Sequence, residues 1–282
     1  MRHLDLSKDF TTEDILFKDN KLTFKKSIAE TVEIDLNRYR IPNLTVEVFE
    51  DVKVDIYERI DIDSLKTYAE TVENHGYLNE QRILFGQEKS GDVISKVENY
   101  NLYTLTILDL TSNGLKGDVD IATNKEGAES YIYCASLCGN DNKLLTNKIV
   151  NYAPQTVGIM ENYGVAYQKG KLEIVGIGDI KHGCYKSTNR QKSNLIVMDK
   201  EAVASSKPYL YIDENDVIAS HASAVGEVSS EQIFYLMARG IEYEVAKKMI
   251  VLGYFQPIIN RISDDNIKDK IVDYVGRVLF NA

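Results

Sequence analysis

The chain is poor in the residues that mark several large classes of protein. Its three cysteines, Cys134, Cys138 and Cys184, are too few and odd in number for a disulfide framework. Reduced thiols of this kind are typical of the cytoplasm, which is the location that we predict. Only four prolines are present, so no proline-rich linker divides the chain. No apolar run approaches the ~18 residues of a transmembrane helix, and the charged N-terminus lacks the apolar stretch of a secretory signal.

Basic residues are also in the minority. Asp and Glu number 43 against 33 Lys and Arg, which gives a formal net charge of −10. Because a surface of this charge repels phosphate, neither nucleic acid nor an anionic membrane is an expected partner. Hydrophobic residues make up 44% of the chain, which is typical of a globular protein rather than a disordered one.

Alternating hydrophobicity predicts a body that is built of strands. Between residues 44 and 62 nearly every even position is apolar, whereas the odd positions are mostly polar. Successive side chains of a strand point to opposite faces, so this pattern indicates strands with one buried face. The pattern fails at Glu50 and Glu58, where we predict corners between short strands. Further apolar runs, separated by turn-forming residues, occupy 102–110, 131–135, 172–180, 195–198 and 209–212.

No amphipathic helix pattern interrupts the sequence between about residues 90 and 225. Strands without crossover helices argue against a doubly wound α/β fold. Three architectures remain open at this point: a sandwich, a barrel and a β-solenoid. Eighteen tyrosines and the absence of tryptophan are compatible with all three.

Helical spacing replaces the strand pattern from about residue 226. Ser229 or Ser230 is placed to cap a first helix, which Gly240 is placed to end. A second helix of about ten residues follows, and we predict that it ends at Gly253. After a short turn that begins at Pro257, a last helix completes what we predict to be a small helical bundle.

Two glycine patterns resemble nucleotide-binding loops, but both fail on spacing. Gly164 and Gly170 are separated by five residues instead of four, and Leu172 stands where a Ser or Thr would bind magnesium. The segment from Gly176 to Gly178 lacks the third glycine of a dinucleotide-binding motif. We interpret these glycines as strand corners and expect any ATP-dependent step to reside in another chain.

Candidate metal ligands and catalytic residues are scarce. The chain has four histidines, and no Ser-His-Asp arrangement or carboxylate pair can be assigned by spacing. Cys134 and Cys138 lack the second ligand pair of a zinc site. His182 and Cys184 would face the same way on a strand, which leaves both a soft-metal site and a structural role open.

The segment between residues 207 and 241 carries the most specific pattern. It contains Lys207-Pro208-Tyr209-Leu210-Tyr211-Ile212 and Ser220-His221-Ala222, followed by Gln232-Ile233-Phe234-Tyr235-Leu236 and Arg239-Gly240-Ile241. These motifs resemble the SufB/SufD family, the scaffold proteins of the SUF iron–sulfur cluster assembly machinery. A weaker similarity at Asn151-Tyr152-Ala153-Pro154-Gln155-Thr156 extends the resemblance over roughly the second half of the chain.

The resemblance selects one of the three architectures. It implies a right-handed parallel β-helix over residues 1–225 and a C-terminal helical domain over residues 226–282. At roughly 20–25 residues per coil, we expect about nine or ten coils. Family members usually carry a further N-terminal helical region, whereas this chain begins almost directly with strand-like sequence and so resembles a minimal version.

The resemblance also implies a scaffold that is not an enzyme. Two such subunits pair through their β-helices in a SufBCD complex, so the partner is a SufB-like subunit or a second copy of this chain. The C-terminal helices would dock SufC, an ABC-type ATPase. The residues that we expect at this contact lie on the first two helices: Ile233, Phe234, Leu236, Met237, Arg239, Met249 and Ile250.

Two positions make the chain resemble SufD rather than SufB. The strand at 192–198 lacks the cysteine of SufB-like sequences, and Ala222 replaces the glutamate that follows their histidine. His221 matches the SufD histidine that supplies a ligand across the subunit interface. The resemblance therefore makes His221 a candidate ligand of a transient iron–sulfur cluster at that interface, with Cys184 as a weaker candidate. It implies no tightly bound cofactor.

Two other functions remain open. The chain is short for the family, so it is also a candidate for a self-pairing scaffold that needs no SufB partner. A β-helix enzyme acting on glycans is the other alternative, and it requires two or three carboxylates clustered on one outer face. The predicted cytoplasmic location and the helical tail argue against this enzyme.

Overall fold

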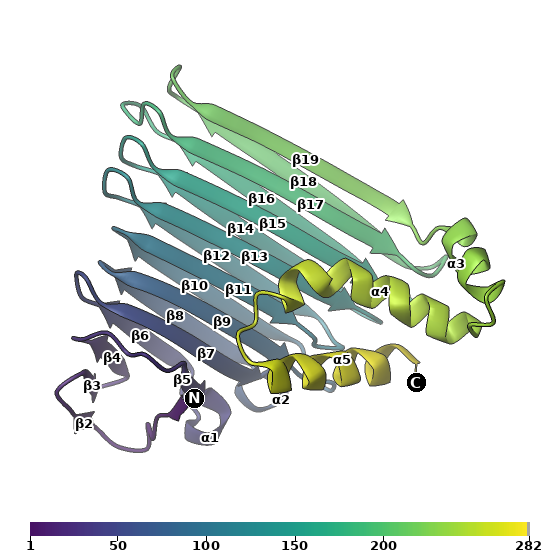
Figure 1. The fold of residues 1–282 in the computed structure, drawn as a ribbon, viewed down its shortest axis with the longest axis horizontal. Helices are drawn as coiled ribbons and strands as arrows, with labels where there is room; N and C mark the ends of the chain where they lie inside the picture. The colour runs from purple at the N-terminus through teal and green to yellow at the C-terminus, as the bar shows by residue number, and fades with distance from the viewer. Residues whose placement is uncertain (281–282) are drawn as a thin grey trace.

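Strands dominate the computed structural model, which describes residues 1–280 (Figure 1). Strands make up 52% of the chain and helices 17%, and the parallel sheets form a β-solenoid of about eight turns with C-terminal helices. The predicted β-solenoid is therefore confirmed. The number of turns is lower than predicted because the coils are longer. Paired residues are 24 positions apart at Gly91 and Leu115 but 32 apart at Lys171 and Val203.

Each coil contributes one strand to each of two sheets, so strands that alternate along the chain pair in parallel. Sheet A contains, in order, β1 (Arg2–His3), β5 (Val32–Asp35), β7 (Lys53–Asp61), β9 (Tyr77–Phe85), β11 (Leu102–Asp109), β13 (Glu129–Cys138), β15 (Val157–Ala166), β17 (Thr188–Val197) and β19 (Ile218–Glu227). Sheet B contains β18 (Val203–Ile212), β16 (Lys171–Ile180), β14 (Asn142–Asn151), β12 (Leu115–Thr123), β10 (Gly91–Asn99), β8 (Thr67–Asn74), β6 (Asn43–Val48), β4 (Lys21–Phe24), β3 (Ile15–Lys18) and β2 (Phe10–Thr11). Two short helices, α1 (Leu36–Tyr39) and α2 (Ile62–Leu65), turn corners of the first coils.

The alternating pattern of residues 44–62 produces β6 and β7 as predicted. Its apolar even positions are buried in the lumen between the two sheets, with Val46 and Ile56 fully inaccessible. Glu50 lies in the turn between the two strands, as expected. The corner that we predicted at Glu58 is wrong, because this residue lies inside β7 and is fully buried. Its charge is matched by a partner one coil further along the chain.

Buried asparagines stabilise the corners of successive coils. The Nδ2 group of Asn74 donates to Oδ1 of Asn99 at 2.8 Å and to the Leu102 carbonyl at 2.9 Å. Asn99 in turn donates to the Glu129 carbonyl at 2.8 Å. The pattern recurs in later coils, where Asn189 donates to Oδ1 of Asn151 at 2.9 Å. These bonds satisfy backbone carbonyls that the turning chain leaves without a strand partner.

Three helices follow the solenoid: α3 (Ser230–Met237), α4 (Tyr243–Ile259) and α5 (Asp265–Phe280). Ser229 caps α3 by accepting a hydrogen bond from the Gln232 backbone N–H at 3.3 Å. Gly240 ends this first helical segment in the left-handed region, with φ of 85°, as predicted. No helix in residues 1–280 has the length and apolar character needed to cross a membrane.

The predicted end of the second helix at Gly253 is wrong, because α4 continues through Gly253 and Pro257 to Ile259. Val251 and Phe255 are fully buried on the side of α4 that packs on β11, β13 and β15. Burial of such side chains contributes about 1.5–3 kcal/mol each, which offsets the cost of about 1 kcal/mol for a helical glycine and about 3 kcal/mol for a proline.

The C-terminal helices share their apolar core with the solenoid. In Figure 1, α4 and α5 lie across one face of the stacked strands. Ile258 of α4 and Ile271 of α5 belong to the same buried cluster as Leu108 and Tyr133 on the outer face of sheet A. The helices therefore cover part of this sheet, and α3 lies beyond the ends of its strands (Figure 1).

Candidate interaction surfaces

The two ends of the solenoid differ in how they are closed. At the N-terminal end, sheet B finishes in the antiparallel strands β2 and β3, and the terminal strand of sheet A has only two residues. At the C-terminal end, β18 and β19 are the outermost strands of their sheets, and each is ten residues long (Figure 1). Within the described chain, both have a hydrogen-bonded strand on one side only. We call these two strands the open end.

Apolar side chains are exposed at the open end. Side chains that face the lumen in earlier coils are covered by the next coil, whereas those of the last coil are not. Ile212 and Val225, whose register partners Ile180 and Leu195 are buried in the lumen, are 48% and 46% exposed. On the outer faces of the same two strands, Val203, Tyr209, Tyr211 and Ile218 are also exposed, with exposed fractions of up to 55%. Long strand edges with exposed apolar side chains pair readily with further strands.

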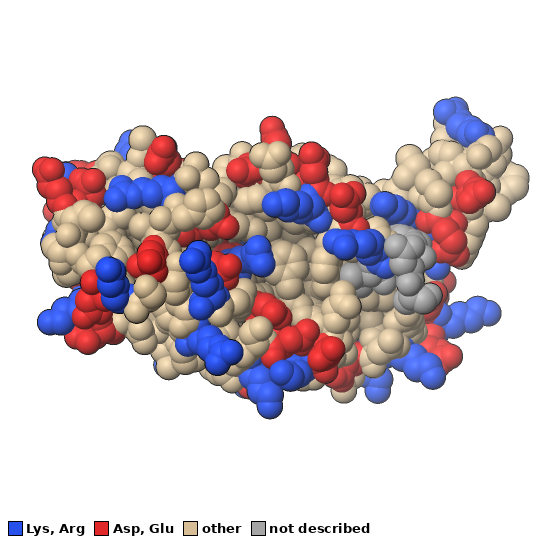
Figure 2. Space-filling view, turned by 90° about the horizontal axis from the view of Figure 1, so that it is seen from below, with Lys and Arg blue, Asp and Glu red and all other residues tan. Residues whose placement is uncertain are grey.

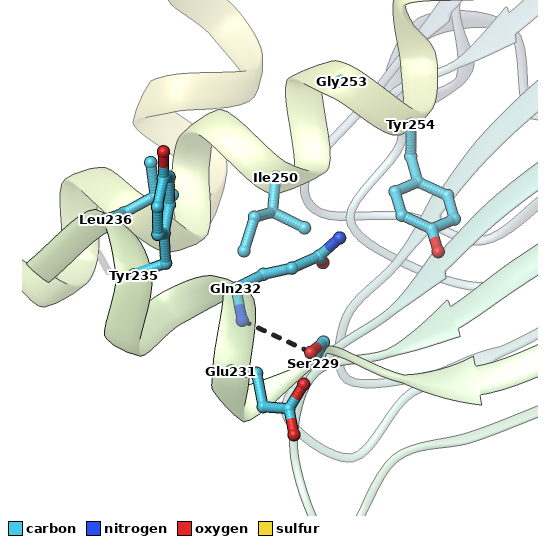
Figure 3. Close-up of a pocket in the computed structure, with 8 residues that line it drawn as sticks. All are labelled: Ser229, Glu231, Gln232, Tyr235, Leu236, Ile250, Gly253 and Tyr254. Atoms are coloured by element: carbon cyan, nitrogen blue, oxygen red, sulfur yellow. Dashed lines mark hydrogen bonds between the residues drawn. The ribbon is translucent and has the colours of Figure 1, made fainter.

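A second apolar surface lies between α3 and α4, directly after the open end. The α3–α4 groove has a volume of about 680 Å³, and its lining includes Leu236 of α3 and Ile250 of α4, which points toward Gln232 in Figure 3. Beside it, Phe234 is 73% exposed, and Met237 and Met249 are also exposed. Unpartnered apolar side chains in this number mark an interaction surface.

Of the seven residues that the sequence predicted for this contact, Leu236 and Ile250 line the α3–α4 groove. Phe234, Met237, Arg239 and Met249 are exposed, whereas Ile233, Leu236 and Ile250 are half-buried between the helices. The guanidinium of Arg239 lies over the Tyr235 ring, 4.3 Å from its centroid. Sequence reasoning missed two exposed residues at the start of α4, Tyr243 and Val245. Their helical position alone does not distinguish them from buried residues.

His221 lies in the middle of β19 and is exposed at the open end. It pairs in register with Gln191 of β17, whose side chain is buried. Since partners in parallel register point to the same side, His221 marks the mouth of the lumen. An exposed imidazole in this place is accessible to a partner that covers the open end.

Cys184, unlike His221, is not exposed at the open end. It lies with His182 in the turn between β16 and β17, so the predicted strand arrangement of these two residues is wrong. The Cys184 thiol is buried and donates to the Asn151 carbonyl at 3.2 Å. Burial raises the pKa of this thiol, which disfavours the thiolate that binds metals. Burial likewise raises the pKa of Cys134 to about 12 and that of Cys138 to about 11.

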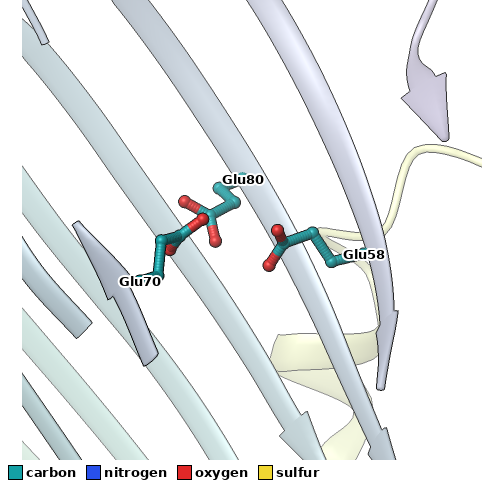
Figure 4. A group of neighbouring side chains, drawn as sticks. All are labelled: Glu58, Glu70 and Glu80. Atoms are coloured by element: carbon teal, nitrogen blue, oxygen red, sulfur yellow. The ribbon is translucent and has the colours of Figure 1, made fainter. Parts of the chain in front are cut away.

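A charged cluster lies inside the lumen of the first coils. Figure 4 shows Glu58, Glu70 and Glu80 converging from β7, β8 and β9. The guanidinium of Arg82 contacts all three carboxylates, with Nε 2.8 Å from Glu58, and its Nη1 donates to Ser95 at 2.6 Å. These five side chains are at most 2% exposed. We call this group the lumen cluster.

The lumen cluster is a structural feature rather than a metal or catalytic site. Oxygens of its three carboxylates lie within 4.8 Å of one another, but the Arg82 guanidinium bonds to all of them. Two buried tyrosines donate to the same carboxylates, Tyr68 to Glu58 at 3.1 Å and Tyr103 to Glu80 at 2.8 Å. A glycan-active enzyme needs carboxylates on an outer face, and these three are sealed from any polysaccharide.

A comparison with protein families agrees with the family resemblance of the sequence and with the β-solenoid fold. The family described as "SUF system FeS cluster assembly, SufBD core domain" matches residues 91–254, which is more than half of the chain. The chain belongs to the SufBD family. The resemblance that we inferred from residues 207–241 is thereby confirmed.

Individual SufBD proteins are similar over part of the chain. The iron–sulfur cluster assembly protein SufD of Bacillus subtilis (strain 168) is 32% identical over 139 residues, which are 49% of this chain and 32% of that protein. SufD of Escherichia coli (strain K12) is 30% identical over 115 residues, 41% of this chain and 27% of its own length. SufB of B. subtilis is 28% identical over 138 residues, 49% of this chain and 30% of its own length. The matched segment thus spans about a third or less of each relative, and the identity is higher for SufD.

Proposed function

We propose that this chain is a SufD-like, non-enzymatic scaffold subunit of cytoplasmic iron–sulfur cluster assembly. The observation that carries this proposal is the open end, where two parallel ten-residue edges lie side by side with exposed apolar side chains. A second solenoid that adds one strand to each sheet would pair these backbone groups and cover the side chains. The net charge of −10 supports a protein partner rather than nucleic acid or membrane.

The proposed partner at the open end is a SufB-like chain, and a second copy of this chain is the alternative. The higher identity to SufD than to SufB supports the unlike pair. Light scattering of the isolated protein and of its mixture with a SufB-like chain separates the two. A monomer that forms a heterodimer with the SufB-like chain supports the proposal. A homodimer that does not bind the SufB-like chain supports self-pairing, and a monomer in both samples contradicts both.

Val225→Lys is expected to weaken pairing at the open end by at least about tenfold, because an unpaired ammonium would be buried in the interface. Val225 is 46% exposed in the unpaired chain, so the melting temperature should change little. Analytical ultracentrifugation with the partner gives the dissociation constant. Leu144→Lys is the matched control, since Leu144 is 37% exposed on β14, away from the open end. Equal weakening by both substitutions would rule out the open end as the interface.

We further propose that SufC, the ABC-type ATPase, docks on the α3–α4 groove. Its apolar walls and the exposed Phe234, Met237 and Met249 suit a helix or loop of a partner that buries apolar side chains. Arg239 lies at the same surface and adds a cationic group that can pair with an acidic residue.

Phe234→Asp is expected to abolish co-purification of the ATPase while leaving the fold intact, because Phe234 is 73% exposed in the unbound chain. Pull-down with SufC and circular dichroism of the variant measure the two effects. Tyr152→Asp is the control, as Tyr152 is 53% exposed in a turn between β14 and β15. Undiminished capture of SufC by Phe234→Asp would contradict docking at α3. A deletion from residue 226 is less informative, since it would uncover the outer face of sheet A.

We propose that His221 contributes an imidazole to a transient cluster, the cargo of the assembly, at the paired open end. Exposure on β19 and the ability of an imidazole to serve as an iron–sulfur ligand support this role. His221→Ala is expected to lower the yield of the anaerobically reconstituted cluster severalfold without weakening subunit pairing, as measured by visible absorption and ultracentrifugation. Ser223→Ala, two residues along the same strand, is the control. An unchanged yield in His221→Ala would return the histidine to a structural role.

A further inference from the structure

A separate cleft lies between α5 and the outer face of sheet A in the first coils. The α5 cleft has a volume of about 760 Å³ and is lined by residues of β1, β5, β7, β9 and α5. None of its lining residues belongs to the α3–α4 groove. Clefts of roughly 300–1,000 Å³ are the usual size of small-molecule sites. The size is therefore compatible with a compact small-molecule ligand.

The floor of the α5 cleft is apolar. Ile83 of β9 and Ile271 of α5 are at most 1% exposed, and Tyr57 of β7 is 5% exposed. Phe85 and Tyr274 stack edge to face, with ring centroids 5.5 Å apart. Burial raises the pKa of Tyr57 to about 12, so its phenol is neutral at physiological pH. The floor thus suits the hydrocarbon part of a ligand.

The acidic side chains of the cleft already have partners. Glu33 lies 2.7 Å from Nδ1 of His3. Asp61 accepts a hydrogen bond from the Asp63 N–H at 3.0 Å, and Asp264 accepts one from the Asn266 N–H at 2.8 Å. Both therefore cap the first turns of α2 and α5, where the helix dipole offsets part of their charge.

Three basic side chains of the cleft are not matched in this way. Arg59 of β7 and Lys270 and Arg277 of α5 make no ion pair with any side chain that the structure describes. Lys270 and Arg277 are seven residues apart, which is two turns on one side of α5, and Arg277 lies over the Tyr274 ring at 5.9 Å. The cleft therefore combines an apolar floor with three cations that are available to an anion.

We propose that the α5 cleft binds an apolar acid, a small molecule whose aliphatic or aromatic body contacts the floor and whose carboxylate pairs with Arg59, Lys270 or Arg277. Arginine and lysine form charge-assisted hydrogen bonds with carboxylates, and a neutral analogue of the same body would lose them. This site is independent of subunit pairing and of ATPase docking.

The absence of tryptophan from the chain permits a local reporter. Phe85→Trp places a single indole on the wall of the cleft, and its emission is followed while decanoate, 3-phenylpropanoate or decanol is added below micelle-forming concentrations. A saturable change is expected with at least one of the acids, and binding of decanol is expected to be about tenfold weaker than that of decanoate. The two acids distinguish an aliphatic from an aromatic ligand. Phe234→Trp, on α3, is the control reporter and should give no saturable change.

The role of the cations is tested in the same reporter background. The combined Arg59→Gln, Lys270→Gln and Arg277→Gln variant is expected to bind the acid at least about tenfold more weakly. Lys268→Gln is the matched control, because Lys268 is on α5 and pairs with Asp265 at 2.7 Å outside the cleft. If the combined variant melts early, the three single variants, each expected to weaken binding about threefold, replace it. Equal affinity in the cation variants, equal binding of decanol, or no saturation with either acid would overturn the proposal.

Discussion

Arg82→Met is expected to lower the free energy of unfolding by about 3–5 kcal/mol, because it leaves three buried carboxyl groups without the guanidinium that pairs with them. Arg82 contacts Glu58, Glu70 and Glu80, and all four side chains are inaccessible to water. The substitution also removes the donor to Ser95. Domains of this kind are stable by only about 5–15 kcal/mol, so a loss of this size would leave the variant marginally folded.

Urea unfolding followed by circular dichroism measures this effect, with Arg59→Met as the control. Arg59 is exposed on the neighbouring strand of sheet A, and its replacement should change stability by no more than about 0.5 kcal/mol. Adding Glu58→Gln and Glu70→Gln to Arg82→Met should restore part of the loss, because the variant then buries fewer unpaired charges. A midpoint for Arg82→Met within error of the wild type would show that the lumen cluster does not stabilise the solenoid.

The lumen cluster also shows why the sequence predicts the strands of the solenoid but not the charged groups buried between them. The alternation in residues 44–62 was sufficient to predict β6 and β7, because burial of one strand face repeats every second residue. Glu58 breaks this alternation and was interpreted as a corner. Its register partner is Arg82, 24 residues later, so the compensating charge is visible only once the coil length is known.

The ends of the C-terminal helices can likewise be predicted from the sequence only where local interactions determine them. Ser229 and Gly240 mark helix ends through local hydrogen bonds and backbone geometry, and both were predicted from the sequence. Gly253 and Pro257 have equally strong local signals, but the contact of Phe255 with sheet A keeps α4 continuous. The open end is predictable only through the family resemblance, since exposure of Val225 or Tyr211 depends on which coil is last.

The stability of the solenoid is expected to fall as the pH rises from about 4.5 to about 7. In this range, buried carboxyl groups of the lumen cluster keep their protons in the folded chain but lose them in the unfolded chain. Burial, together with the charge of Glu58, raises the pKa of Glu80 from 4.5 to about 7, although Arg82 opposes the shift. Burial and the neighbouring carboxylates also raise the pKa of Glu70. A carboxyl group whose pKa is higher in the folded than in the unfolded chain stabilises the fold most below the unfolded pKa. This contribution is then lost as the pH rises through the folded pKa.

For Glu80 the slope is about 1.4 kcal/mol per pH unit over this window, and the total change is about 3 kcal/mol. Glu80→Gln should flatten the dependence, because the amide carries no titrating proton and its oxygen can still accept the hydrogen bond from Tyr103. Glu129→Gln is the control, since Glu129 accepts a bond from Tyr131 outside the lumen cluster and should leave the slope unchanged. Urea midpoints at pH 5, 6, 7 and 8 for the three proteins give the comparison. If wild type and Glu80→Gln lose stability in parallel between pH 5 and 7, the titrating group lies elsewhere, and the cluster is held by a permanently charged network of ion pairs.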